Sequence, residues 1–328
     1  MDIFLQQLIN GVTLGAVYAV VALGYTMVYG VIQLINFAHG EVVMIGAMVA
    51  FTVIQVLVPS GLPPIVVLLI GTSCAIPVCM LIGYAMERLA YRPLRRAPRL
   101  APLITAIGIS IILQHLAMLV WSRNVLAFPQ IVRTRVYEVG GAAITNVQIA
   151  ILAICVATMA ALAWLVYRTR LGTAMRATAQ NPQVAGLMGV NIDRIISATF
   201  VIGAGLAGLA GVMVGSYYGI AQYTMGSLLG LKAFCAAVLG GIGNIPGAML
   251  GGVLLGIVEA LGAGYIGELT DLCRFADFSD ALAERCAVDR HFILFGSNYQ
   301  DVFAFLVLIA VLVLRPSGLL GERVGDRA

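Results

Sequence analysis

Long apolar runs separated by short polar segments are the feature that most constrains this chain. A helix needs about 20 apolar residues to cross about 30 Å of hydrocarbon. Charged residues make up only 10% of the 328 positions and hydrophobic residues 61%, so the charges are too few to cover a water-soluble globule. We therefore predict an all-α, polytopic bundle of eight or nine transmembrane helices, forming one membrane domain over residues 1–328. The apolar runs lie near residues 8–32, 38–58, 64–86, 102–121, 147–167, 192–216, 227–243, 246–266 and 299–314.

The placement of the arginines predicts how the spans are oriented. Many arginines gather in short segments next to span ends, where the positive-inside rule applies best. If these segments are all cytoplasmic, an even number of crossings must separate them, and the runs above satisfy this condition. We therefore predict an outer N-terminus and an inner C-terminus, although Arg123, Arg133 and Arg135 fall on the outer side. The twelve inner arginines, of 19 basic residues, are Arg88, Arg92, Arg95, Arg96, Arg99, Arg168, Arg170, Arg176, Arg194, Arg315, Arg323 and Arg327.

Pairs of glycines four residues apart predict close packing between helices. On a helix such a pair lies on one face and lets two backbones approach closely. Residues 240–247, Gly-Gly-Ile-Gly-Asn-Ile-Pro-Gly, break the helical pattern because Pro246 has no backbone donor. This segment is either irregular backbone beside a transport path or a tight turn between two spans. The glycine pairs are Gly211/Gly215, Gly226/Gly230, Gly247/Gly251 and Gly252/Gly256.

Polar and ionisable residues in the apolar runs are candidates for a transport path, because burying a charge in hydrocarbon is costly. His39 and Glu41 begin the second run, where we expect their side chains to reach interfacial water. Glu259 lies deep in the eighth run and either pairs with another group or lines the path. Lys232, the only lysine, lies near the outer start of the seventh run and is expected to extend towards the interface. The predicted path residues are Asn36, His39, Glu41, Gln114 and Glu259.

The residues needed for catalysis, for metal binding or for ATP hydrolysis are missing from the sequence. The three histidines are far apart, and no pair of them has the spacing of a zinc-protease helix. A nucleotide-binding P-loop needs a lysine before Ser or Thr, but Lys232 lies between Leu231 and Ala233. We therefore expect a chain that is not an enzyme, holds no metal or cofactor and takes its energy from another protein. The chain also lacks a dense acidic relay, which counts against a proton- or sodium-coupled carrier.

The polar segment 168–191 predicts a short helical hairpin on the cytoplasmic side. Its second helix would expose Val184, Leu187 and Met188, so the segment is better suited to docking on a partner than to remaining an ordinary solvated loop. Asn191 is expected to cap the next span. The hairpin consists of a helix at 174–180, a stop at Asn181-Pro182, a second helix at 183–188 and a closing Gly189.

Several long motifs of the chain are familiar as a set. Together they resemble the permease family of branched-chain amino acid ABC importers, and in particular the first of the two permease subunits of the leucine/isoleucine/valine system. The similarity runs through nearly the whole chain. The motifs are Asn-Phe-Ala-His-Gly-Glu-Val-Val-Met-Ile-Gly at 36–46, Glu-Arg-Leu-Ala-Tyr-Arg-Pro-Leu-Arg at 87–95, the hairpin segment, and Ala-Ala-Val-Leu-Gly-Gly-Ile-Gly-Asn-Ile-Pro-Gly-Ala-Met at 236–249.

This resemblance implies the rest of a transport machine in a bacterial inner membrane. It implies a periplasmic binding protein, a second homologous permease subunit and two cytoplasmic ATPases that bind ATP and Mg²⁺. It implies no nucleic-acid partner. Residues 176–193 look like the loop that couples ATPase closure to the permease. The coupling residues that we predict are Arg176, Asn181, Gly189 and Asp193.

Residues 268–298 form a longer outer loop than the resemblance leads us to expect. The loop contains Cys273 and Cys286, and an oxidising periplasm would favour a disulfide between them. The insertion also leaves the cargo less certain than the family. The alternatives that remain open are a permease of this family for another small solute such as urea, a stand-alone passive channel and an ion-coupled carrier.

Overall fold

The computed structural model describes residues 2–95, 97–98, 100–270, 273 and 299–321, and these residues are mainly helical, as predicted. A 3₁₀ turn, η1 (Val58–Ser60), extends α2, and a π-helical turn, η2 (Glu87–Tyr91), extends α3. The helices are α1 (Asp2–Ile32), α2 (His39–Leu57), α3 (Pro64–Met86), α4 (Leu100–Val120), α5 (Asn146–Arg168), α6 (Arg170–Gln180), α7 (Pro182–Leu187), α8 (Ile192–Tyr218), α9 (Met225–Gly240), α10 (Ile245–Leu269) and α12 (Gln300–Leu314).

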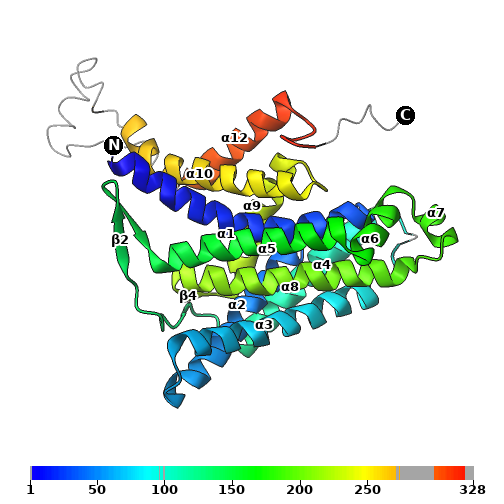
Figure 1. Cartoon of the computed structure of the whole chain (residues 1–328), viewed down its shortest axis with the longest axis horizontal. Helices are drawn as coiled ribbons and strands as arrows, with labels where there is room; N and C mark the ends of the chain where they lie inside the picture. The colour runs from blue at the N-terminus through cyan, green and yellow to red at the C-terminus, as the bar shows by residue number, and fades with distance from the viewer. Residues whose placement is uncertain (1, 96, 99, 271–272, 274–298, 322–328) are drawn as a thin grey trace.

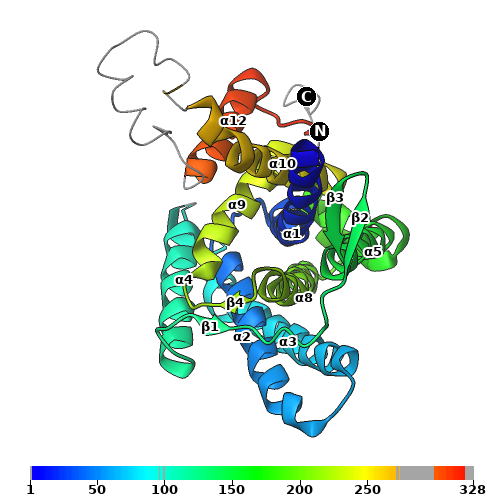
Figure 2. The same ribbon diagram turned by 90° about the vertical axis from the view of Figure 1, so that its left-hand side faces the viewer.

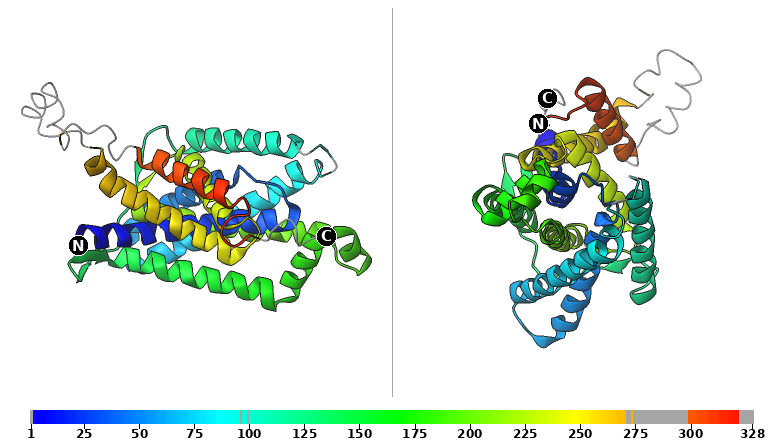
Figure 3. Two further views of the ribbon diagram at one scale, coloured as in Figure 1. Left: turned by 90° about the horizontal axis from the view of Figure 1, so that it is seen from above. Right: turned by 90° about the vertical axis from the view of Figure 1, so that its right-hand side faces the viewer.

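Each of the nine predicted apolar runs coincides with one helix of the described chain. Seven helices are long and apolar enough to cross a membrane, and α9 and α12 are shorter apolar helices. The predicted helix bundle is therefore confirmed, and the chain is a multi-pass membrane protein. Helix α1 begins at one end of the bundle, and the hairpin α6–α7 lies at the other (Figure 1 and Figure 3).

Two small antiparallel sheets were not predicted. One joins β1 (Leu126–Ala127) to β4 (Ile220–Ala221), and the other is the hairpin of β2 (Val136–Val139) and β3 (Ala142–Thr145). Gly140 and Gly141, with φ of 61° and 86°, make the two-residue turn that a tight hairpin needs. Such short strands leave little periodic signal in a sequence. The β2–β3 hairpin lies at the end of the bundle opposite α7 (Figure 1).

Glycines bring α1 and α10 close together, as the glycine pairs predict. A Cβ built on Gly252 of α10 would lie 2.6 Å from the Cα of Ala19 on α1. A Cβ on Gly15 of α1 would in turn lie 2.6 Å from the Cα of Val253. Both approaches are shorter than real Cβ contacts, so only glycine fits. The other three pairs pack in the same way against α2, α9 and the segment after β1.

Leucine at Gly252 should destabilise the bundle. The added side chain meets the backbone of Ala19, which cannot rotate away, so we expect a loss of about 1–3 kcal/mol or more. The thermal unfolding midpoint of the detergent-purified protein measures this loss. Gly108→Leu on α4 is the matched control, because nothing lies within 4 Å of a Cβ at Gly108. Equal midpoints for the two variants would contradict the close-packing account.

The segment 240–247 is a tight turn, the second of the two alternatives. Helix α9 ends at Gly240 and α10 begins at Ile245. The tail after α12 covers the turn: Leu319 N donates to Leu239 O at 2.9 Å, and Leu320 N donates to Gly240 O at 3.0 Å. The Asn244 side chain donates to Leu320 O at 2.8 Å. Tail residues thus satisfy the carbonyls that end α9.

Helix α2 begins inside the bundle and not at its surface. Glu41, in the first turn of α2, accepts a hydrogen bond from Ser110, which lies near the middle of α4. Cys79 of α3 donates to Val42 O at 3.4 Å. The expectation that His39 and Glu41 reach interfacial water is therefore wrong, since both are buried among neighbouring helices.

Candidate coupling site and buried polar groups

The helical hairpin predicted between the fifth and sixth spans is present as α6 and α7. Asn181 caps α7, because its side-chain oxygen accepts from Gln183 N at 3.0 Å and Val184 N at 3.1 Å. Gly189 follows α7 with φ of 86°, a left-handed conformation that glycine adopts without strain. Asn191 caps α8 by accepting from Arg194 N at 3.1 Å, as predicted. The turn chemistry of the sequence thus forms the hairpin.

The tip of the hairpin exposes apolar side chains. Leu187 is 87% exposed and Met188 is 80% exposed, and Val184 on the same short helix is also exposed. Ala185 instead faces inward and is buried. A contiguous apolar tip on a polar segment is typical of a surface that another protein covers.

Arg176 lies at the base of the hairpin, against α5, and not at its exposed tip. Its guanidinium donates to Val166 O at 2.9 Å and lies over the Tyr167 ring, 5.6 Å from the ring centroid. These contacts hold α6 against the last turn of α5. Of the four predicted coupling residues, Arg176, Asn181 and Gly189 therefore shape and anchor the hairpin within this chain.

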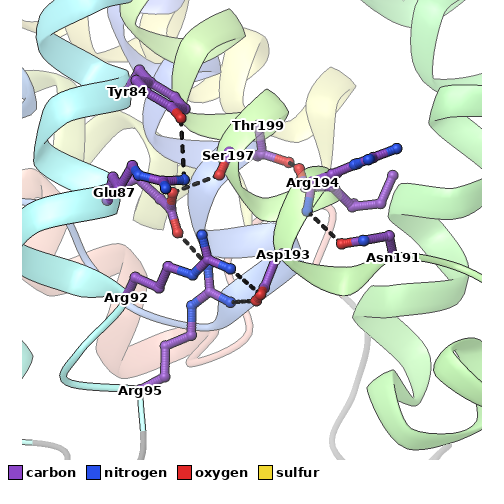
Figure 4. Close-up of polar contacts among 11 residues, drawn as sticks. Tyr84, Glu87, Arg92, Arg95, Asn191, Asp193, Arg194, Ser197 and Thr199 are labelled. Carbon is purple, nitrogen blue, oxygen red and sulfur yellow. Dashed lines mark hydrogen bonds and ion pairs between the residues drawn. The ribbon is translucent and has the colours of Figure 1, made fainter.

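Asp193, the fourth predicted coupling residue, joins the start of α8 to the segment after α3. Its carboxylate pairs with Arg92 and with Arg95, the latter at 2.5 Å (Figure 4). Arg95 also pairs with Glu87, which accepts a 2.5 Å hydrogen bond from Ser197 of α8. The two carboxylates and two guanidiniums form a continuous network. The network thereby joins α8, which follows the hairpin, to the end of α3.

The sequence indicated the arginines of this network only as markers of orientation, and it did not indicate Glu87 as a site residue. Glu87 is fully buried although it lies in an arginine-rich segment. The sequence feature that could have indicated Glu87 is its place as a single acid beside Arg88, Arg92 and Arg95. Its partner across the bundle, Ser197, comes from a distant part of the chain, so the sequence alone did not predict the pair.

Removing Glu87 should cost more stability than removing Asp193. Glu87→Ala leaves the partly buried Arg95 with one carboxylate fewer inside the protein, so we expect a loss of about 3 kcal/mol. Asp193 is half exposed, and water replaces its ion pairs, so Asp193→Ala should cost about 1 kcal/mol or less. Thermal unfolding of the two purified variants gives the comparison. A larger loss for Asp193→Ala would contradict this ranking.

Asn36, His39 and Glu41 are brought together at the start of α2. The Asn36 side-chain oxygen accepts from Ala38 N at 3.1 Å and from the Tyr91 hydroxyl at 2.8 Å. These bonds give Asn36 a structural role, in shaping the entry to α2. Gln114 lies one helical turn from Ser110 on α4, so it shares the α4 face next to Glu41.

Glu259 belongs to a separate buried cluster. Lys232 Nζ lies 2.7 Å from one carboxylate oxygen of Glu259, and the Tyr18 hydroxyl donates to the other at 2.9 Å. Asp301 also pairs with Lys232, at 2.6 Å. Glu259 is therefore paired with other side chains, which was the first of the two alternatives predicted for it. The expectation that Lys232 extends to the interface is wrong, because an acidic partner inside the bundle holds it there.

Cys286, and with it the predicted bond to Cys273, lies outside the described residues, as does most of the insertion 268–298. The predicted disulfide stays a prediction.

Comparison with known proteins places the chain in a family. A family model described as the permease component of the branched-chain amino acid transport system matches residues 7–312. The high-affinity branched-chain amino acid transport system permease protein BraD of Pseudomonas aeruginosa is 44% identical over 324 residues, covering 97% of this chain and 96% of that protein.

Further relatives carry similar names. The high-affinity branched-chain amino acid transport system permease protein LivH of Escherichia coli K12 is 43% identical over 325 residues, 97% of this chain and 96% of that protein. A probable branched-chain amino acid transport permease protein LivH of Methanocaldococcus jannaschii is 25% identical over 203 residues, 58% of this chain and 59% of that protein. No solved structure matches the chain. The chain therefore belongs to the family of permease components of branched-chain amino acid transport systems.

Proposed function

We propose that this chain is a membrane-spanning subunit of an ATP-driven importer that moves branched-chain amino acids into the cytoplasm. The observation that carries the proposal is the apolar tip of the α6–α7 hairpin, at the end of the bundle where Arg92, Arg95 and Arg176 lie. The family membership and the names of the relatives support the cargo class.

The arginine-rich end of the bundle faces the cytoplasm in this proposal. Arginine-rich segments next to spans are retained on that side of a bacterial inner membrane. The N-terminus then lies in the periplasm, together with residues 268–298, and the C-terminus lies in the cytoplasm. The hairpin is thereby presented to cytoplasmic proteins.

The partners follow from what this chain does not supply. Two cytoplasmic ATPase subunits hold the ATP and Mg²⁺ and dock on the hairpin tips, while this chain binds no cofactor. A second, homologous permease subunit completes the path, with this chain as the first of the two. A periplasmic binding protein delivers the amino acid to the outer face.

Reconstitution tests this function. The chain, the second permease and the ATPases are purified together, placed in liposomes, and assayed with the binding protein outside and ATP inside. We expect leucine uptake that requires hydrolysable ATP and all the subunits. Leucine uptake by the lone chain without ATP would contradict the proposal, as would a failure of the chain to co-purify with any ATPase.

A further inference from the structure

Glu41 is a buried acid without a cation. Its side chain is 1% exposed, and its Oε1 accepts one long hydrogen bond, 3.3 Å from Ser110. Its Oε2 has no hydrogen-bond partner among the residues that the structure describes. A carboxylate held this way inside a membrane protein is costly unless a positive group comes to it. The Glu41 carboxylate therefore requires a positively charged partner, which the described residues do not provide.

Among the described residues, Lys232, Arg92 and Arg95 already have carboxylate partners. Lys232, the only lysine, is held by Glu259 and Asp301. Arg92 and Arg95 are held by carboxylates at the hairpin end of the bundle. A metal ion would need more ligands, and the described residues gather no three His, Cys, Asp or Glu side chains that could hold one. An organic cation with few ligands fits the site better.

Two helix N-termini meet at the Glu41 carboxylate. Glu41 lies in the first turn of α2, and its Oε2 would be 2.5 Å from a Cβ built on Gly226, in the first turn of α9. The positive ends of both helix dipoles therefore meet at this oxygen. The arrangement stabilises the anion, which is the form that attracts an ammonium group.

The wall on one side of Glu41 is the helix that packs least against the rest. Ser110 belongs to α4, which lies at the edge of the bundle and is the least buried of the seven helices long enough to cross a membrane (Figure 2). A helix with few packing contacts costs little to displace. A small molecule can therefore reach Glu41 if α4 moves, without disruption of the glycine-packed core.

Aromatic groups near Glu41 suit the side chain of an amino acid. His39, two residues before Glu41 on α2, points to another face of the helix, where its Nε2 would lie 2.3 Å from a Cβ built on Gly24 of α1. The rings of Tyr25 and His39 lie 4.7 Å apart, and Phe234 lies 6.1 Å from Tyr25. Phe37 packs 5.5 Å from Phe234. The three aromatic rings offer an apolar surface for a branched side chain.

We propose that Glu41 binds the ammonium group of the amino-acid cargo inside the bundle, with Ser110 beside it. This inference rests on the proposed function, because it takes the cargo to be an amino acid. The competing explanation is a carboxylic acid that stays neutral and has only a structural role. The two explanations differ in whether the neutral isostere glutamine can replace the glutamate.

The test uses the complete complex in liposomes and the variants Glu41→Gln and Glu41→Asp. Loss of a charge-assisted hydrogen bond to the ammonium group should lower leucine uptake about tenfold to 100-fold in Glu41→Gln. Glu41→Asp keeps the charge and should retain more uptake than Glu41→Gln. Co-purification of each variant with the other subunits shows that the complex has assembled. Wild-type uptake in Glu41→Gln would overturn the proposal.

A failure of the proposed function is seen separately, because the wild-type complex then takes up no leucine at all. If Glu41→Gln does not assemble, Ser110→Cys supplies a second test. An aminoethyl methanethiosulfonate reagent carries an ammonium group and should modify this cysteine, and leucine should protect it. Mass spectrometry of the tryptic peptide 100–123, which contains no native cysteine, reads the modification. A rate that leucine leaves unchanged would overturn the proposal.

Discussion

Replacing Lys232 by methionine is expected to destabilise the bundle by about 3–5 kcal/mol, because it strands two acids inside the protein. Among the described residues, Lys232 is the cation that pairs with Glu259 and Asp301, at 2.7 and 2.6 Å. Its Nζ also lies 3.3 Å from the Tyr18 hydroxyl. The cluster joins α1, α9, α10 and α12, so its loss should loosen four helices together. Thermal unfolding in detergent measures the effect.

A triple variant is the control for this prediction. Lys232→Met with Glu259→Gln and Asp301→Asn removes all three charges and keeps the side-chain volumes nearly unchanged. Buried ion pairs are often replaced by neutral groups at little cost, so this variant should recover most of the lost stability. If the triple variant unfolds as early as Lys232→Met alone, the stranded charges are not the cause.

Gly189→Pro is expected to abolish most ATP-coupled uptake while leaving the protein in the membrane. Proline requires φ near −65°, but Gly189 has φ of 86°, and its N–H donates to Gly186 O at 3.1 Å. The substitution should therefore displace the end of α7 and its apolar tip. We expect uptake to fall more than about tenfold, with ATP hydrolysis no longer coupled to it. Parallel assays of uptake and hydrolysis in liposomes measure this uncoupling.

The matched control is Gly61→Pro. Gly61 also has a positive φ, 70°, and a Cβ there would meet nothing within 4 Å. It lies between η1 and α3, away from the hairpin, so the same backbone strain arises far from the docking tip. Gly61→Pro should keep coupled uptake. Normal uptake in Gly189→Pro would remove the hairpin from the coupling mechanism.

The fold was predictable because its main signals are local. Each apolar run forms a helix, and Asn181, Gly189 and Asn191 mark helix ends through chemistry that acts within a few residues. Glycine pairs such as Gly252/Gly256 also showed which faces pack closely. Lipid leaves the backbone few alternatives to a helix, which makes these signals decisive.

The polar interior was less predictable because its partners are far apart in the chain. Lys232 and Asp301 are 69 positions apart, and Glu87 meets Ser197 across 110 positions. Neither pair has a spacing that a sequence pattern could reveal. The position of the start of α2 was predicted wrongly for a related reason. The first residues of a membrane helix ordinarily lie near the interface, but a hydrogen bond between Asn36 and Tyr91 holds the start of α2 inside the bundle.

If the α6–α7 hairpin transmits force from an ATPase subunit, its tip must touch that subunit, and photo-crosslinking detects such a contact. A photoreactive amino acid is placed at Leu187, which is 87% exposed on the hairpin, and at Val136, which is 61% exposed on β2 at the other end of the bundle. The account predicts an ATPase adduct from position 187 that changes with bound nucleotide, and none from position 136. An ATPase adduct from position 136, or none from position 187 in an active complex, would contradict it.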